Sequence, residues 1–325
     1  MSASFDARQE IERRVAFLAG QLTSTGLRSL VLGISGGVDS MTAGRLCQLA
    51  VERVRAAGRE ATFFAMRLPY GVQADEGDAQ LALEFIRPDR VLTVDVQPAS
   101  DAALEALLAG GLVFRDAHHQ DFTHGNVKAR QRMIAQFAVA GANEGLVVGT
   151  DHAAEAVSGF FTKFGDGAAD VVPLTGLTKR RVRAVAEALG APSALVHKTP
   201  TADLETLNPG RPDEEALGVT YDDIDDFLEG EPVGEAAFAA IVGRYRLTEH
   251  KRQPPIAPEP IPSAGRGGGD DRLPASRSRR PVGEAETTAA RDGRGPLGVR
   301  RAAERAVPAG SGGETGRTGD RVGRQ

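Results

Sequence analysis

The sequence predicts an α/β fold, a doubly wound parallel sheet with helices on both of its faces. Short runs rich in Val, Leu, Ile and Phe alternate with longer segments of helical periodicity, so strand and helix follow one another four times. A Gly- and Ser-rich stretch at 33–40, "GISGGVDS", follows directly on the first apolar run. Hydrophobic residues make up 41% of the 325 residues, which is enough to build the core of such a sheet.

Each element has a signal of its own. A first helix is expected over residues 5–26, because Ile11, Val15 and Leu18 recur at helical spacing and Gly26 is a stop signal. Compact apolar runs predict strands over 29–34, 61–68, 90–96 and 145–150. The segments that follow these runs predict helices over 39–58, 73–86, 101–109, 126–143 and 151–164. In parallel sheets ligands bind at the carboxyl ends of strands, so the informative loops are 33–40, 67–75 and 149–155.

The amino-acid composition of the chain changes near Pro254. Residues 254–325 hold 14 Gly and 9 Pro, no aromatic residue and no Lys, with 13 Arg against 9 acidic residues. Such a stretch cannot bury enough apolar surface to offset its ordering entropy. We therefore expect one domain over residues 1–256 and a low-complexity, disordered tail over 257–325. The tail is either a solvated extension or a basic interaction arm.

Composition and charge also argue against nucleic-acid-binding, secreted and membrane-spanning proteins. The net charge of −5 gives no reason to expect a nucleic-acid partner. The single cysteine, Cys47, cannot form an intrachain disulfide, which fits a reducing compartment. The first twenty residues are too charged for a signal peptide, and no apolar stretch approaches the roughly 18 residues of a membrane span. A cytoplasmic protein without a membrane partner is expected.

The loop at 33–40 is predicted to bind phosphate. Unpaired N–H groups at a helix start attract anions, glycines allow close approach, and the serines add hydroxyl donors. It is not a Walker loop, because no Lys follows its last Gly. Asp39 would repel a phosphate unless a cation lay between them, which indicates Mg²⁺. The alternative is a tight turn with an Asp cap.

The sequence resembles a known family. "SGGVDS" is similar to the pyrophosphate loop of ATP pyrophosphatases, adenylating enzymes with a Rossmann-like fold of the adenine nucleotide alpha hydrolase type. Further motifs occur in the order found in ammonia-dependent NAD⁺ synthetases: "RLPYGVQADE", "GNVKARQRM", "VVGTDHAAEAVSGFFTKFGDGAAD", "PLTGLTKR", "KTPTADLE", "DEEALGVTYDDIDDFLEG" and "TEHKRQPP". The resemblance covers residues 5–256. The alternatives are another adenylating enzyme of the superfamily and a non-catalytic ATP-binding protein of the stress-protein type.

The resemblance implies a ligase that makes NAD⁺ in two steps. The nicotinate carboxylate of deamido-NAD⁺ attacks the α-phosphate of ATP, pyrophosphate leaves, and ammonia then displaces AMP from the NAD-adenylate. ATP is a cosubstrate, Mg²⁺ is the cofactor, and no covalent enzyme intermediate is needed. The family is homodimeric, with the dinucleotide at the subunit interface. Glutamine-dependent relatives carry a glutaminase domain ahead of the loop, and only 32 residues precede Gly33 here, so free ammonia is the expected nitrogen source.

The resemblance also assigns roles to residues. For Mg²⁺ it implies Asp39 and Glu155. The alternative for Glu155 is a solvated position on a helix. The alternative for Lys179 is an ordinary surface lysine at a helix start. For ATP it implies Gly33, Ile34, Ser35, Gly36, Gly37, Val38, Asp39, Ser40, Arg67 (near the adenine ring), Thr150, Lys179 and Thr201. For deamido-NAD⁺ it implies Arg130, Lys163, Asp170, His250 and Lys251, the last two being otherwise a solvated basic segment.

Other chemistry-bearing residues are expected to be structural. His118, His119 and His124 are interpreted as residues of a polar loop, because four ligands at metal spacing are not present. Cys47 lies between apolar neighbours and is interpreted as a core residue and not a nucleophile. The acidic cluster Asp222, Asp223, Asp225 and Asp226 is interpreted as a solvated helix start, with a second cation site as the alternative.

Overall fold

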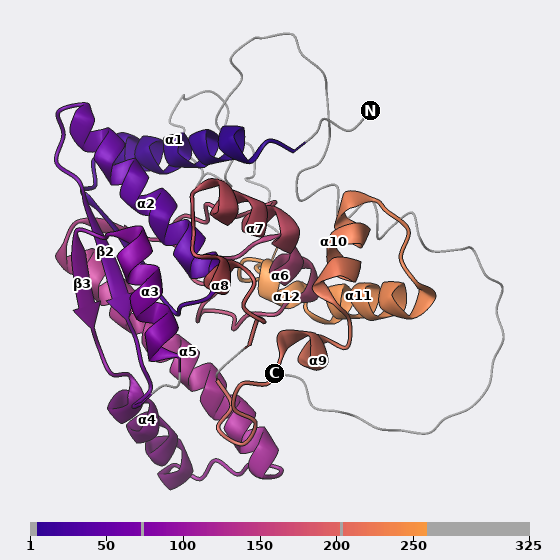
Figure 1. Ribbon diagram of the computed structural model, residues 1–325. Coiled ribbons are helices and arrows are strands. Elements are labelled where there is room, and N and C mark those ends of the chain that lie inside the picture. Colours follow the sequence, from indigo (N-terminus) through magenta and orange to yellow (C-terminus); the bar gives the residue numbers. More distant parts are fainter. Residues whose placement is uncertain (1–4, 73–74, 202–203, 259–325) are drawn as a thin grey trace, which may run out of the picture. The chain divides into compact units, whose positions relative to one another are not determined.

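The computed structural model describes residues 5–72, 75–201 and 204–258 (Figure 1). Four parallel strands form one sheet in the order β3–β2–β1–β4, which confirms the predicted parallel α/β architecture. The strands are β1 (Ser29–Gly33), β2 (Thr62–Arg67), β3 (Arg90–Thr93) and β4 (Gly145–Val147).

The strand order reverses at β1. The chain runs outward from β1 through β2 to β3 and then returns to place β4 on the other side of β1. The connections that leave β1 and β4 therefore diverge, and a crevice forms at their carboxyl ends, where such sheets bind ligands. The loop after β1 is the Gly-rich stretch 33–40, and the loop after β4 begins at Val148.

One face of the sheet carries the larger part of the core. Leu30 and Leu32 of β1 and Phe63 of β2 point into it, and they pack with buried side chains of the helices on this face. Helix α2 contacts the three others (Figure 1). These helices are α1 (Ala7–Thr25), α2 (Val38–Ala56), α3 (Glu76–Ile86) and α7 (Lys179–Ala188).

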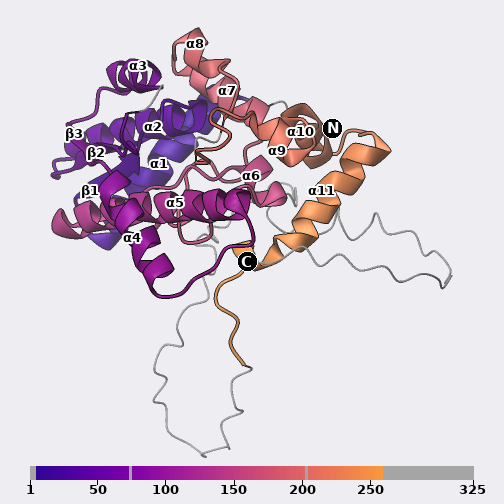
Figure 2. The ribbon, with the colours of Figure 1, turned by 90° about the horizontal axis from the view of Figure 1, so that it is seen from below.

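The opposite face is covered by α5 (Ala117–Ala142), and α4 (Gln97–Ala109) packs against α5. Val31, Met66 and Val147 alternate with the residues of the first face and pack here with Ala140 of α5. Because successive side chains of a strand point to opposite faces, the two sets are what a sheet covered on both sides requires. Figure 2 shows the strands between α2 and α3 on one side and α4 and α5 on the other. The predicted doubly wound sheet is confirmed.

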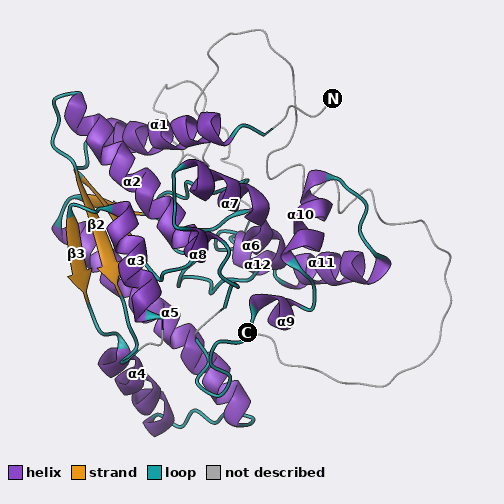
Figure 3. Cartoon of the chain, in the orientation of Figure 1, coloured by secondary structure: helices purple, strands orange, loops and turns teal. Residues whose placement is uncertain are grey.

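The remaining helices follow the last strand, and all but α11 have fewer than ten residues. Long loops connect several of them, notably on either side of α7 and α8 (Figure 3). They are α6 (Ala153–Ser158), α8 (Ser193–Val196), α9 (Asp213–Leu217), α10 (Tyr221–Glu229), α11 (Glu235–Leu247) and α12 (Glu249–Arg252).

Several predicted boundaries are wrong. The helix expected over 151–164 ends at Ser158, because Gly159 adopts a left-handed conformation (φ +64°) and caps it. The helix expected over 126–143 begins earlier, at Ala117, where the Asp116 carboxylate accepts a hydrogen bond from the N–H of His119. His118, His119 and His124 therefore lie in α5 and not in a loop.

The third strand and the helix after it also differ from their predicted boundaries. The strand expected over 90–96 ends at Thr93, although the Val96 N–H still donates a hydrogen bond to the carbonyl of Pro69, and α4 begins at Gln97 where the sequence suggested residue 101. Asp95 accounts for the early turn, because its carboxylate accepts hydrogen bonds from the N–H groups of Gly71 and Gln97. The first two residues of the helix expected over 73–86 lie outside the described residues.

In the described part of the chain, no helix is both long and apolar enough to cross a membrane. The predicted tail lies outside the described residues, apart from its first positions.

Deleting residues 258–325 is expected to leave the melting temperature of the protein unchanged. The segment has no aromatic side chain and few aliphatic ones, so it offers little surface to bury, and its exposed charges are screened beyond about 8 Å at physiological salt. Calorimetry of the full-length and shortened chains checks this. Limited proteolysis should remove the tail first. A melting temperature that falls by several degrees on deletion would contradict the prediction.

Candidate functional site

The Gly-rich loop is held in shape by its two serines. The hydroxyls of Ser35 and Ser40 lie 3.0 Å apart, and the Ser40 hydroxyl also accepts a hydrogen bond from the Ser35 N–H. Helix α2 begins directly after Gly37, which caps it without a side-chain hydrogen bond. The N–H groups of its first turn are therefore available to an anion. The tight-turn alternative is wrong in one respect, because Asp39 lies inside the first turn and is not the cap.

Gly36 is the position at which the loop requires glycine. Its φ is +86°, and a Cβ atom built there would lie 2.8 Å from the backbone nitrogen of Ala79 in α3. Neither the backbone conformation nor the space allows an ordinary side chain. The loop is thus packed against the start of α3.

Asp39 and Lys179 form a buried ion pair across 140 residues of sequence. The Lys179 ammonium donates a hydrogen bond of 2.7 Å to Asp39 Oδ2, and the lysine side chain is 2% exposed. Burial opposes the ionisation of Asp39, but the positive charge and the hydrogen bond of Lys179 outweigh it and hold the pKa of Asp39 below its usual value. Burial likewise opposes the charge on Lys179, yet Asp39 and Glu155 raise its pKa. Lys179 is therefore not the solvated surface lysine of the alternative interpretation.

His152 and Glu155 complete this cluster. The His152 Nε2 atom lies 3.6 Å from Asp39 Oδ1 and 3.6 Å from Glu155 Oε1, and one donor atom from each of the three lies within 4.8 Å of the others. Burial, and then the Asp39 charge, raise the pKa of Glu155 well above its usual value. Burial lowers the pKa of His152 to about 4, against the opposing effect of Asp39. His152 is thus a neutral imidazole whose Nε2 atom lies close to both carboxyl groups.

This cluster could hold a cation. Asp39 Oδ1 and both ring nitrogens of His152 are buried without a hydrogen-bond partner among the described residues. Buried polar atoms without partners are rare in native structures and call for a ligand or water. Two carboxylates this close resist simultaneous ionisation unless a positive charge joins them. Glu155 is only partly exposed and faces the cluster, so the interpretation of it as a solvated helix position is wrong.

Arg67, the last residue of β2, holds the Gly-rich loop through hydrogen bonds. Its side chain is 3% exposed, and it donates hydrogen bonds to the carbonyl oxygen of Ile34 and to the carboxylate of Glu76. The guanidinium thus ties the end of β2 to the loop after β1. Its Nε atom has no partner among the described residues. The prediction that Arg67 reaches an adenine ring stays a prediction.

The two predicted ATP-binding threonines lie in different surroundings. Thr150 follows β4 at the carboxyl end of the sheet, next to the cluster residue His152, and is half-buried. Thr201 is exposed and pairs through an isolated bridge with Pro212, just before α9. The predicted contacts of both residues with ATP stay predictions.

Four of the five predicted dinucleotide-binding residues gather around the loop after α6. Arg130 donates a hydrogen bond of 3.3 Å to the carbonyl of Lys163, and the Lys163 ammonium donates one of 2.5 Å to the carbonyl of His250. Lys251 donates to the carbonyls of Gly159 and Phe161. The segment that carries His250 and Lys251 is therefore attached to the body.

Asp170 has a backbone partner of its own. Its Oδ2 atom accepts a hydrogen bond of 2.8 Å from the N–H of Val147, at the end of β4. The carboxylate thus fixes the end of the strand that leads into the candidate site.

The acidic cluster at the start of α10 is not wholly solvated. Asp225 is 1% exposed, and its two oxygens accept hydrogen bonds from the N–H groups of Lys179 and Arg180. Asp222 fits the original interpretation, since its side chain is 82% exposed. The spacing of the acidic run places Asp225 on the same face as Tyr221 and Ile224, and this was the available signal of burial.

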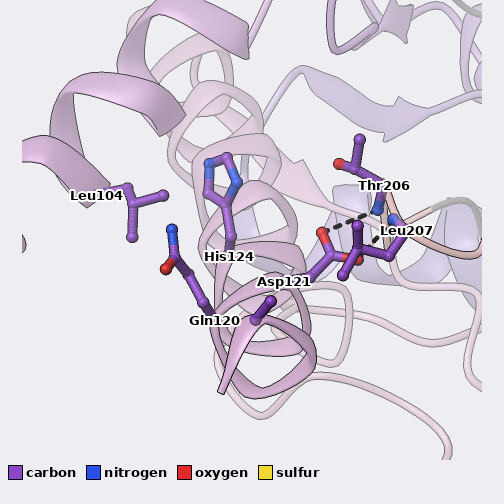
Figure 4. Close-up of a pocket in the computed structure, with 7 residues that line it drawn as sticks. Leu104, Gln120, Asp121, His124, Thr206 and Leu207 are labelled. Atoms are coloured by element: carbon purple, nitrogen blue, oxygen red, sulfur yellow. Dashed lines mark hydrogen bonds between the residues drawn. The ribbon is translucent and has the colours of Figure 1, made fainter. Parts of the chain in front are cut away.

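A cavity of about 300 Å³ lies apart from the cluster residues, between α4, α5 and residues 206–207 (Figure 4). Asp121 lines it, and its carboxylate accepts hydrogen bonds from the N–H groups of Thr206 and Leu207. Burial opposes the charge of Asp121, but these two hydrogen bonds hold its pKa below the usual value. Asp121 therefore attaches residues 206–207 to α5. His124 lines the same cavity and belongs to no metal cluster among the described residues.

Cys47 is a buried residue of α2 and lies in the hydrophobic core, as predicted. Burial raises the pKa of its thiol, so the nucleophilic thiolate is disfavoured.

Comparison with known proteins agrees with this geometry. The family model for NAD synthase matches residues 10–255. An NH₃-dependent NAD⁺ synthetase of Streptomyces coelicolor is 80% identical over 258 residues, 79% of this chain and 94% of the relative. The crystal structure of NAD⁺ synthetase from Burkholderia pseudomallei is 64% identical, with a TM-score of 0.67 over 77% of this chain and 91% of that one. The structure of NMN synthetase from Francisella tularensis is 32% identical, with a TM-score of 0.69 over 79% and 100% of the two chains. The chain belongs to the NAD synthase family.

Proposed function

We propose that this protein is an ammonia-dependent NAD⁺ synthetase, a ligase that amidates deamido-NAD⁺ at the expense of ATP. The observation that carries the proposal is the buried cluster of Asp39, Lys179 and Glu155 beside the Gly-rich loop, at the point where the strand order reverses. The 80% identity to an enzyme of that name supports the same reaction. The alternative, a non-catalytic ATP-binding protein, gains no support from a site with two carboxyl groups and an ammonium.

The chain's own groups suit the first step. The N–H groups at the start of α2 and the loop hydroxyls suit the phosphates of ATP. The ammonium of Lys179 offsets the charge that builds up as pyrophosphate leaves. The nicotinate carboxylate oxygen bonds to the α-phosphorus while the bond to pyrophosphate breaks. Ammonia then bonds to the activated carbonyl carbon, and AMP leaves with that oxygen.

Mg²⁺ fits the cluster. Asp39 and Glu155 supply the oxygen ligands that this ion prefers, and Asp39 Oδ1 is buried without a partner among the described residues. Asp39 and Glu155 would hold a bound Mg²⁺, and the ion would supply positive charge that offsets the negative charge of the phosphates. The neutral His152 is the third member of the cluster, with its Nε2 atom 3.6 Å from an oxygen of each carboxyl group.

Arg130, Lys163, Asp170, His250 and Lys251 are proposed to bind deamido-NAD⁺. Four of them lie around the loop after α6, so cationic groups converge where a dinucleotide pyrophosphate or the nicotinate carboxylate would bind. A homodimer with the dinucleotide at the subunit interface is part of the proposal and follows from the family resemblance. Phe122, Ile134 and Phe137 of α5 are large exposed apolar side chains that suit a subunit contact.

The proposal is tested by turnover of the purified full-length chain. Deamido-NAD⁺, Mg–ATP and ammonium are expected to give NAD⁺, AMP and pyrophosphate in equal amounts. Because one similar structure is an NMN synthetase, the corresponding acid mononucleotide is the comparison substrate. Preference for the mononucleotide would overturn the assignment of substrate, and the absence of pyrophosphate release with either acid would overturn the assignment of reaction.

Glutamine is not expected to replace ammonium. Glutamine hydrolysis by an amidotransferase needs a reactive thiolate, and the one cysteine of this chain is buried in the core. Measuring NAD⁺ formation with ammonium and with ammonia-free glutamine checks this. A Cys47→Ala variant is the control and should keep its activity with ammonium. Equal rates with both nitrogen donors would contradict the prediction.

A further inference from the structure

We propose that helix α10 positions the Lys179 ammonium through two residues one turn apart, Asp225 and Tyr221. Asp225 holds the backbone of the lysine, and Tyr221 supports its charged end. Both are positioning residues, since they act through Lys179. The inference rests on the proposed function and assigns to α10 a part in the adenylation step.

Asp225 fixes the place where Lys179 enters its helix. The carboxylate accepts hydrogen bonds of 2.9 Å from the Lys179 N–H and 2.7 Å from the Arg180 N–H. Helix α7 already has a local cap, because the Thr178 hydroxyl accepts from the Arg181 N–H. A buried carboxylate from a distant helix is therefore not needed merely to start α7. Its two hydrogen bonds set the distance between the Lys179 backbone and α10.

Tyr221 lies under the other end of the lysine. The Lys179 Nζ atom is 4.9 Å from the centre of the Tyr221 ring, within the range of cation–π attraction. The ring is 2% exposed, and its hydroxyl is held by a hydrogen bond of 3.2 Å to Asp213. The ammonium is thus placed between an aromatic face and the Asp39 carboxylate, 2.7 Å away.

The aromatic face suits a lysine that must act on phosphate. A second carboxylate at this position would hold the ammonium by neutralising it and would compete with the anionic ligand. A ring attracts the ammonium without cancelling its charge. Lysine has a flexible four-carbon stem, so support at the backbone and at the ammonium removes most of its freedom before ATP binds.

The test measures single-turnover pyrophosphate release at saturating Mg–ATP. Asp225→Asn and Tyr221→Leu are each expected to slow this step about 10- to 100-fold, the usual effect of losing a group that orients an active-site residue. Asp222→Asn and Phe227→Leu are matched controls on the same helix. The first removes an exposed carboxylate and the second a half-buried ring that packs on Phe238, and neither should change the rate more than about twofold.

A double-mutant cycle separates positioning from a general loss of stability. In a Lys179→Met background, Asp225→Asn and Tyr221→Leu should slow the step by less than about threefold, because the group they position is gone. Effects that multiply fully in that background would overturn the proposal, as would an unchanged rate for both single variants.

Two aromatic replacements of Tyr221 test its contact with the ammonium even if Asp225→Asn or Tyr221→Leu fails to fold. Tyr221→Phe preserves the ring, and pentafluorophenylalanine at the same position preserves its shape while removing its negative face. We expect Tyr221→Phe to stay within about threefold of wild type and the fluorinated ring to be about tenfold slower. Equal rates for the two rings would refute the role of Tyr221. The wild-type chain in the same assay reports on the proposed function itself, so failure of that function is seen separately.

Discussion

Asp39→Asn is expected to abolish adenylation, lowering the rate of pyrophosphate release by about 10³-fold or more. The change keeps the size of the side chain but removes the negative charge proposed to bind Mg²⁺ beside the phosphates, where charge neutralisation supplies several kcal/mol of transition-state stabilisation. Single-turnover pyrophosphate release at saturating Mg²⁺ is the measurement. A rate near that of wild type would contradict the role assigned to Asp39.

The same variant should also be less stable. Lys179 is 2% exposed and would lose its charged partner, and breaking a buried ion pair from one side costs about 3 kcal/mol or more. Urea unfolding measures the loss. Asp222→Asn is the control, because its side chain is 82% exposed and the substitution is chemically identical. Equal unfolding midpoints for the two variants would show that the ion pair contributes little.

Glu155→Gln is expected to match Asp39→Asn in catalysis and to differ from it in stability. Catalysis should fall by a similar factor, because one of the two proposed Mg²⁺ ligands loses its charge. The protein without ligands should become more stable at neutral pH. In the folded protein, burial and the neighbouring Asp39 raise the pKa of Glu155 well above its usual value, so the ionised carboxylate is disfavoured there.

The direction in which stability changes with pH follows from the number of protons that the folded and unfolded states bind at Glu155. Between the ordinary pKa of glutamate, about 4.3, and the raised value, the folded protein binds more protons at this site than the unfolded one. Wild-type stability therefore falls as the pH rises through this window, and Glu155→Gln removes that loss. The melting temperatures of the two proteins should coincide near pH 4 and separate by a few °C near pH 7, as about 1 kcal/mol produces in a domain of this size.

Cation binding is the second measurement on this variant. Mn²⁺, followed by electron paramagnetic resonance in the presence of ATP, should bind to the wild type and at least about tenfold more weakly to Glu155→Gln. Glu52→Gln is the control, since Glu52 is exposed on the surface of α2. Mn²⁺ affinities that do not differ between the variants would contradict the shared-cation account.

The order of strands and the place of the phosphate loop could be predicted because their signals are local. An apolar run, a Gly-rich turn and an amphipathic segment identify themselves within about twenty residues each. Asp39 was identified by such a signal, because a carboxylate within a phosphate loop requires a cation. The pairing of Asp39 with Glu155 was available only through the family resemblance, since these residues are far apart in the chain. The ion pair of Asp39 with Lys179 was not predicted, because the resemblance assigned Lys179 to ATP.

His152, Tyr221 and Asp225 were missed because their importance lies in what they pack against. His152 lies in "GTDHAAEA", close to a predicted ligand, but only the folded chain shows that its Nε2 atom lies 3.6 Å from both Asp39 and Glu155. In "TYDDIDDFLEG" four aspartates look alike, and the contact with α7 buries one of them. A helical projection of that segment would have placed Tyr221, Ile224 and Asp225 on one face.

We expect the carboxylate of deamido-NAD⁺ to be adenylated at this site before ammonia attacks. Labelling both oxygens of that carboxylate with ¹⁸O tests it most directly, because in this mechanism the oxygen that bonds to the α-phosphorus leaves with AMP. Mass spectrometry of the products should find one ¹⁸O in each AMP and one in the carboxamide of each NAD⁺, with none in pyrophosphate. AMP without the label, in a reaction that still makes NAD⁺, would contradict the account.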